Sequence, residues 1–118
     1  MKVLIVEDEP LVAMMIEDAV IEAGHEIAGT LGTMHDALGA IASLDFDVAL
    51  LDMNLGGQQA HPLPVAMTAR GKPFAFVTGY GEAGVLAQFR HMPVVTKPFI
   101  ATEIAEALVQ LQEVLTPS

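Results

Sequence analysis

Two short and continuously apolar segments, residues 3–6 (VLIV) and 48–51 (VALL), most constrain how this chain folds. A strand with one solvated face alternates apolar and polar residues, whereas a strand covered on both faces is apolar throughout. Five β-branched or aromatic-rich runs alternate with longer segments of helical periodicity, and they lie at residues 2–6, 25–30, 47–51, 73–78 and 93–96. This alternation predicts an α/β fold, a doubly wound parallel sheet of five strands with helices on both faces.

Three helices are predicted from clear sequence signals. The first is predicted over residues 10–23, because Pro10 suits a helix start and Gly24 suits a stop. Residues 33–36 (TMHD) match the [ST]-x-x-[DE] capping pattern and predict a second helix that continues to about residue 44. An apolar stripe that begins at Ile100 predicts the terminal helix.

The other two connections are weaker helix candidates. Two glycines at 56–57 and two prolines at 62 and 64 delay the third helix, which is predicted over about residues 63–70. The fourth, near residues 82–91, is expected to be short or irregular, because it contains or follows two glycines, at 81 and 84.

Length and composition narrow the possible functions. The 118 residues fit one domain, so we expect a single domain over 1–118 and no output domain. Five basic against fifteen acidic residues give a net charge of −10, which disfavours binding to nucleic acid or to an anionic membrane surface. No apolar run approaches a membrane span and no secretory signal is visible, so a cytoplasmic location is expected.

Polar side chains follow four of the predicted strands where each strand ends. Glu7 and Asp8 follow the first strand, Asp52 the third and Lys97 the fifth, while Thr78 closes the fourth. In a doubly wound sheet the functional crevice lies beyond these carboxyl ends, so we expect the five side chains to converge. Three neighbouring carboxylates would raise one another's pKa unless a cation lay among them, and their oxygens suit a hard ion such as Mg²⁺.

The same group of residues has the components of phosphoryl transfer. An aspartate can act as a nucleophile toward a phosphoryl group and form an aspartyl phosphate. A metal ion and a lysine would neutralise the phosphoryl oxygens, while a hydroxyl and backbone N–H groups donate hydrogen bonds to them. Asp52, Lys97 and Thr78 supply these side chains.

With these residues in this order, the sequence resembles the receiver domain of two-component response regulators. The resemblance covers essentially the whole chain and rests on four motifs in order, VLIVEDEP (3–10), LDMNL (51–55), VTG (77–79) and TKPF (96–99). It implies a flavodoxin-like sheet with strand order 2-1-3-4-5, a phosphoprotein in a phosphorelay, and Mg²⁺ or Mn²⁺ as the cofactor.

The resemblance also implies roles for individual metal-site residues. Asp52 matches the phosphoacceptor and a metal ligand, and Asp8 matches a second direct ligand. Glu7 corresponds to the acidic neighbour that holds the ion through water, and Asn54 would offer its backbone carbonyl to the ion.

Further positions match the switch machinery of the family. Thr78 corresponds to the switch hydroxyl, Lys97 to the ammonium that pairs with the phosphate, and the bond before Pro98 is typically cis. The aromatic switch residue is replaced by Val94, and residues 76–81 (FVTGYG) partly resemble a receiver subfamily named for a Phe-Ala-Thr-Gly-x-Tyr motif. That subfamily is often linked to HWE-type histidine kinases. In this chain one hypothesis is that Tyr80 takes over the switch role, and the alternative, which the residue alone favours, is that Tyr80 only packs.

The leading hypothesis is therefore a stand-alone receiver. It would accept a phosphoryl group on Asp52 from a histidine kinase or a phosphotransfer protein, then signal by protein contact or act as a phosphate sink. It would not be an enzyme with a separate substrate, and it would bind a downstream protein. The alternatives are an adaptor that works without phosphorylation and, less favoured, an aspartate-nucleophile phosphatase, whose second Asp would have to stand where Asn54 does.

Overall fold

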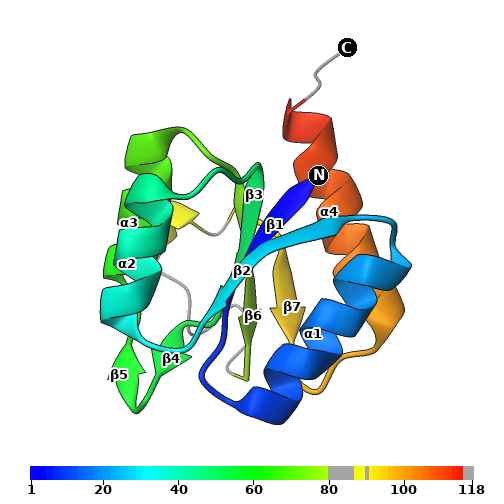
Figure 1. Ribbon diagram of the computed structural model, residues 1–118, viewed down its shortest axis with the longest axis horizontal. Coiled ribbons are helices and arrows are strands. Elements are labelled where there is room, and N and C mark those ends of the chain that lie inside the picture. The colour runs from blue at the N-terminus through cyan, green and yellow to red at the C-terminus, as the bar shows by residue number, and fades with distance from the viewer. Residues whose placement is uncertain (80–86, 90, 116–118) are drawn as a thin grey trace.

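The computed structural model describes residues 1–79, 87–89 and 91–115, and it shows a twisted five-stranded sheet covered by helices on both faces (Figure 1). The elements are, in chain order, β1 (Lys2–Val6), α1 (Pro10–Glu22), β2 (Glu26–Leu31), α2 (Met34–Ser43), β3 (Val48–Leu51), β4 (Asn54–Leu55), β5 (Gln58–Gln59), α3 (Pro62–Arg70), β6 (Phe74–Thr78), a 3₁₀ turn (Ala87–Phe89), β7 (Val94–Thr96) and α4 (Ala101–Leu115). Within the described ranges, no helix is long and apolar enough to cross a membrane.

The main sheet has five strands in the order β2-β1-β3-β6-β7, and all four neighbouring pairs are parallel. Counted along this sheet alone, the order is 2-1-3-4-5, so the predicted fold class and strand order are confirmed. Because the strands are parallel, their carboxyl ends meet at one edge. The order reverses at β1, which places the chain segments that follow β1 and β3 next to each other at the switch point.

Burial of both faces explains the continuously apolar strands. Helices α1 and α4 cover one face of the sheet, and α2 and α3 cover the other (Figure 1). Along β1, Val3 and Ile5 pack with the α1–α4 side, whereas Leu4 and Val6 pack with the α2–α3 side. Successive side chains on a strand point to opposite faces, so each central strand contributes to two separate apolar cores.

Helix α2 begins as the capping pattern predicts. The Thr33 hydroxyl accepts a hydrogen bond from the backbone N–H of Asp36 at 3.1 Å, which satisfies one of the free N–H groups in the first turn. Helix α3 begins at Pro62, one residue earlier than predicted, because a proline at the first helical position needs no N–H partner.

The connection between β3 and α3 contains a hairpin that the sequence analysis did not predict. Strands β4 and β5 pair antiparallel, and Gly56 and Gly57 join them with φ angles of 56° and 82°. Two consecutive positive φ angles define a type I′ turn, which glycine adopts without steric cost. The two glycines therefore close a hairpin, rather than only delaying the third helix.

The expected fourth helix lies mostly outside the described residues. Within the segment 82–91, Ala87–Phe89 form a 3₁₀ turn, and Phe89 is buried with its ring centroid 5.9 Å from that of Phe74. Tyr80 also falls outside the described residues, so its expected switch role stays a prediction.

The two environments of leucine in this fold lead to a stability prediction. We expect Leu4→Ala, at a fully buried site in β1, to lower the free energy of unfolding by about 2–5 kcal/mol, because it removes packed methyl groups from the core. Leu11→Ala is the matched control, because Leu11 is 76% exposed and should change stability by less than about 0.5 kcal/mol. Urea unfolding of both variants measures the difference, and equal losses would contradict the assigned core.

Candidate functional site

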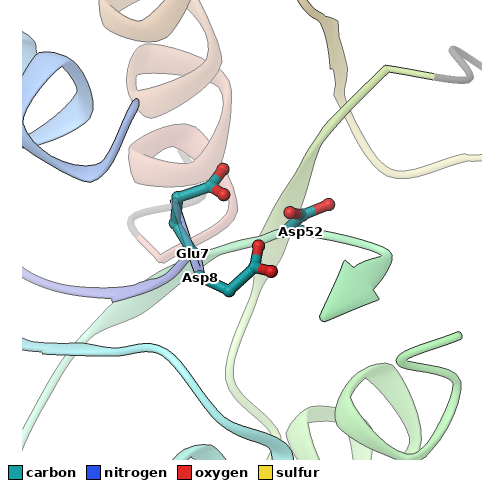
Figure 2. Close-up of side chains that lie close together, drawn as sticks. All are labelled: Glu7, Asp8 and Asp52. Atoms are coloured by element: carbon teal, nitrogen blue, oxygen red, sulfur yellow. The ribbon is translucent and has the colours of Figure 1, made fainter. Parts of the chain in front are cut away.

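The ends of β1 and β3 bring three carboxylates together. Val6 and Leu51 are paired in the sheet, and the N–H of Asp52 continues this ladder by donating to the carbonyl of Val6 at 3.0 Å. Carboxylate oxygens of Glu7, Asp8 and Asp52 lie within 4.8 Å of one another (Figure 2). The strand register therefore produces the acidic cluster that the sequence predicts at this edge.

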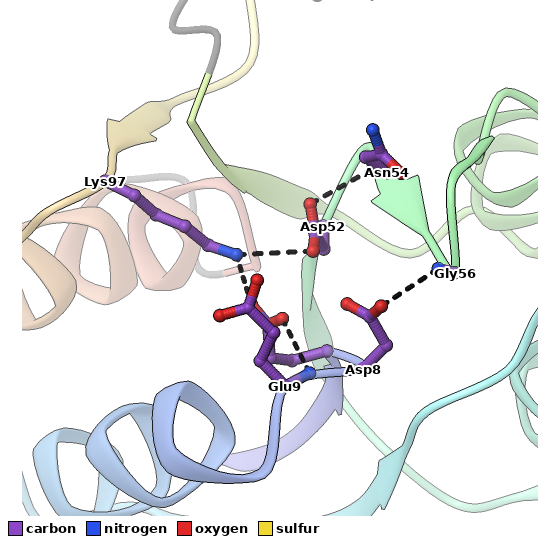
Figure 3. A network of polar contacts seen from close by, with 7 residues as sticks. Asp8, Glu9, Asp52, Asn54, Gly56 and Lys97 are labelled. Carbon is purple, nitrogen blue, oxygen red and sulfur yellow. Dashed lines mark hydrogen bonds and ion pairs between the residues drawn. The ribbon is translucent and has the colours of Figure 1, made fainter.

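Lys97, which follows β7, extends its side chain into this cluster. Its Nζ lies 2.5 Å from Oε1 of Glu7. The same Nζ lies 3.2 Å from Oδ2 of Asp52 (Figure 3). Its backbone N–H donates to the carbonyl of Thr78 at 2.9 Å, and the peptide bond between Lys97 and Pro98 is cis. One ammonium group thus bridges carboxylates from two different strands.

Burial changes the protonation of the carboxylate at the base of the cluster. Glu7 is only 3% exposed, and this burial raises its pKa to about 7, although Lys97 and the N–H of Glu9 act to lower it. Burial acts to lower the pKa of Lys97, but the neighbouring Glu7 and Asp52 carboxylates outweigh it and raise that pKa. The cluster therefore holds more potential negative charge than its single lysine neutralises.

Asp52 is nearly buried, at 4% exposure, and has a different neighbour on each carboxylate oxygen. Its Oδ1 accepts a hydrogen bond from the N–H of Asn54 at 3.0 Å, and its Oδ2 faces Lys97. The carboxylate opens into a pocket of about 470 Å³ with a largely polar lining. The lining residues are Asp8, Glu9, Asp52, Asn54, Gly57, Gly79 and Lys97.

Two other positions singled out in the sequence lie at the edge of this arrangement. Thr78 ends β6 and is fully buried, so it adjoins the pocket through its backbone bond to Lys97 and does not line it. Val94, which stands where an aromatic residue is usual, begins β7 and is half-buried.

The structure adds groups that the sequence analysis missed. The N–H of Gly56 donates to Oδ2 of Asp8 at 2.9 Å, and the N–H of Glu9 donates to Oε2 of Glu7 at 3.1 Å. The exposed Glu9 also lines the pocket. The adjacent glycines at 56–57 are a hairpin signal, but the bond to Asp8 joins residues 48 positions apart and has no local signature.

The donor atoms of the cluster fit a hard divalent cation. Mg²⁺ and Mn²⁺ prefer oxygen ligands, and Mg²⁺ sites commonly use one or two carboxylates together with water and a phosphate. The three gathered side chains offer carboxylate oxygens only, and an ion among them would offset the charge that Lys97 leaves unbalanced.

Comparison with known proteins assigns the class. The response regulator receiver domain matches residues 3–109. SdrG from Sphingomonas melonis Fr1 is 42% identical, with 94% of this chain and 95% of that chain covered and a TM-score of 0.83. The receiver domain of PhyR from Erythrobacter litoralis is 33% identical, with 94% and 88% covered and the same TM-score of 0.83.

A more distant structure supports the fold alone. The response regulatory domain of mrkE from Klebsiella pneumoniae is 24% identical over the full length of both chains, with a TM-score of 0.84. No curated protein matches the chain. The chain belongs to the response regulator receiver domain family of two-component signalling, and it is homologous to SdrG and to the PhyR receiver domain.

The raised pKa of Glu7 predicts how stability depends on pH. The unfolded chain releases the Glu7 proton near pH 4.5, whereas the folded chain keeps it to about pH 7. The free energy of unfolding should therefore fall as the pH rises between these values, and the Glu7 contribution should level off above about pH 7. Denaturant unfolding across this range measures the slope, and Glu7→Gln should reduce it. An equal slope in the variant would contradict the assignment.

Proposed function

We propose that Asp52 accepts a phosphoryl group from a phosphohistidine of a histidine kinase or of a phosphotransfer protein. The observation that carries this proposal is the placement of the Asp52 carboxylate. It is nearly buried and 3.2 Å from the Lys97 ammonium, and it opens into a polar pocket large enough for a phosphoryl group. The receiver family is phosphorylated by these two classes of donor.

In this step an Asp52 carboxylate oxygen forms a bond to phosphorus while the phosphorus–nitrogen bond of the donor breaks. The bonding electrons return to the imidazole nitrogen, so the step balances without a further reactant. Lys97 neutralises charge on the phosphoryl oxygens. Glu7, Asp8 and Asp52, with the backbone carbonyl of Asn54, would hold a Mg²⁺ ion, which supplies further neutralisation of those oxygens.

The product is a regulatory state of a cytoplasmic signalling protein, and no separate metabolite is turned over. A phosphoryl group adds charge of about −1.5 to −2 beside Lys97 and brings new acceptor oxygens to the buried end of β6. Thr78 lies there, joined to Lys97 through the backbone, and would respond to the new acceptor. The related SdrG was solved in a BeF₃-activated conformation, at 41% identity to this chain. The phosphorylated protein then either contacts a downstream protein or acts as a phosphate sink.

Phosphorylation by a small donor tests this proposal directly. Purified chain incubated with Mg²⁺ and acetyl phosphate should gain the mass of one phosphoryl group in intact mass spectrometry, because Asp52 supplies the nucleophile. Asp52→Ala should abolish the gain, and Asp18→Ala, which removes an exposed aspartate from α1, should keep it.

The other outcomes separate the alternatives. An unmodified wild-type chain, with both acetyl phosphate and a histidine kinase as donors, would favour an adaptor that works without phosphorylation. Turnover of a phosphomonoester that is lost in Asp52→Ala would instead indicate a phosphatase.

The position of α1 supports a proposal for where the protein donor would bind. A phosphohistidine must reach Asp52 through the pocket, so the donor has to cover the pocket rim. Glu9 lines that rim, and α1 begins directly after it. The first turns of α1 expose Leu11, Met14 and Met15, which form an apolar surface next to the rim. We propose that this surface binds a helix of the donor protein.

Two donors of different size test the α1 surface. The double variant Leu11→Ala/Met14→Ala should slow phosphoryl transfer from a histidine kinase by about 10-fold, as expected when apolar anchors of an interface are truncated. Its reaction with acetyl phosphate should not change, because that donor needs no docking surface. Val109→Ala/Val114→Ala, on the exposed side of α4, is the matched control. Equal effects of both pairs on the kinase reaction would contradict the assignment.

A further inference from the structure

The hairpin between β3 and α3 is fixed against the body of the domain. It follows Asp52 after one residue, and its type I′ turn consists of Gly56 and Gly57. Leu55, the last residue of β4, is 3% exposed and belongs to the apolar core on the α2–α3 side. The turn is therefore held in a defined place relative to the ends of β1 and β3.

The pairing register decides where the backbone groups of the hairpin point. Asn54 pairs with Gln59, and on the side away from the turn the N–H of Ala60 donates to the carbonyl of Met53 at 2.8 Å. Hydrogen-bonded and non-hydrogen-bonded pairs alternate in an antiparallel ladder, so the Asn54 pair is non-hydrogen-bonded. The N–H of Asn54 consequently points away from β5, and it donates to Oδ1 of Asp52.

The first turn residue makes the corresponding contact with the other strand end. In a two-residue hairpin the N–H of the first turn residue takes no part in the ladder, and here Gly56 donates it to Oδ2 of Asp8 at 2.9 Å. The bonded oxygen is the one turned away from Asp52, so the other oxygen lies on the Asp52 side (Figure 3). Glu7 and Asp52 are buried and paired with Lys97, whereas Asp8 is more exposed and accepts a hydrogen bond from the N–H of Gly56.

We propose that the β4–β5 hairpin is the positioning element of the metal site, and that the Gly56 N–H is the group that orients Asp8 toward the ion. The proposal rests on the proposed function for the identity of the ion as Mg²⁺. Hydrogen bonds to a charged acceptor are roughly twice as strong as neutral ones. Groups that orient metal ligands typically contribute about 10–100-fold to metal affinity.

Two substitutions at one position separate the hydrogen bond from the side chain. Gly56→Asn keeps the N–H, and asparagine followed by glycine is a preferred type I′ turn, so Mg²⁺ affinity should stay within about twofold of wild type. Gly56→Pro removes the N–H and cannot adopt a positive φ, so affinity should fall by about 10-fold or more. Calorimetric titration with MgCl₂ measures both.

A second measurement needs neither the metal nor an altered hairpin. Amide hydrogen exchange of Gly56, followed by NMR without Mg²⁺, should accelerate by about 10-fold in Asp8→Ala, because the charged acceptor is lost. Glu9→Ala, which removes a neighbouring carboxylate without touching this bond, is the matched control and should leave the rate near wild type. This pair decides the proposal if Gly56→Pro does not fold.

The outcomes are distinct. Equal Mg²⁺ affinity in the wild type and Gly56→Pro, or equal Gly56 exchange in Asp8→Ala and Glu9→Ala, would overturn the positioning role and leave the proposed function standing. A wild-type chain that binds no Mg²⁺ would overturn both.

Discussion

The crowding of carboxylates around one half-buried ammonium group is the constraint on which the functional edge of this domain depends. Lys97 contacts Glu7 and Asp52, and burial leaves Glu7 with a pKa near neutrality. A buried carboxylate without a partner would cost several kcal/mol, so the lysine makes the arrangement possible. One ammonium among three carboxylates still leaves an excess of negative charge, which favours the binding of a cation. A bound cation would also reduce the repulsion between these carboxylates and the oxygens of an incoming phosphoryl group.

The two apolar cores keep this crowded arrangement in register. Side chains alternate between the two cores along each central strand. A one-residue slip of β3 against β1 would therefore move every β3 side chain to the opposite face of the sheet. The pairing of Val6 with Leu51 then sets how far Asp8 lies from Asp52. Apolar packing several residues away thus fixes the register that places the charged residues of the site, and Lys97 offsets part of the charge that this register brings together.

The parts of the fold and site that depend on sequence pattern were predictable, and those that depend on tertiary contact were not. Continuous apolar runs and the Thr33 cap are local signals, and they correctly indicated the sheet and α2. The hairpin was missed because Gln58 and Gln59 lack the β-branched side chains that mark strands. The Gly56–Asp8 bond and the protonation of Glu7 depend on which groups folding brings together and buries, so no local pattern reports them.

The hairpin also bears on how this domain can diverge. Connections between strands and helices usually tolerate insertions and deletions, because they run over the surface and carry few contacts. Here the loss of one glycine from the turn would shift the ladder by a residue and rotate the Asn54 N–H away from Asp52. The length of the β3–α3 connection in this chain is therefore tied to the acidic pocket, because the hairpin N–H groups that contact Asp8 and Asp52 depend on it.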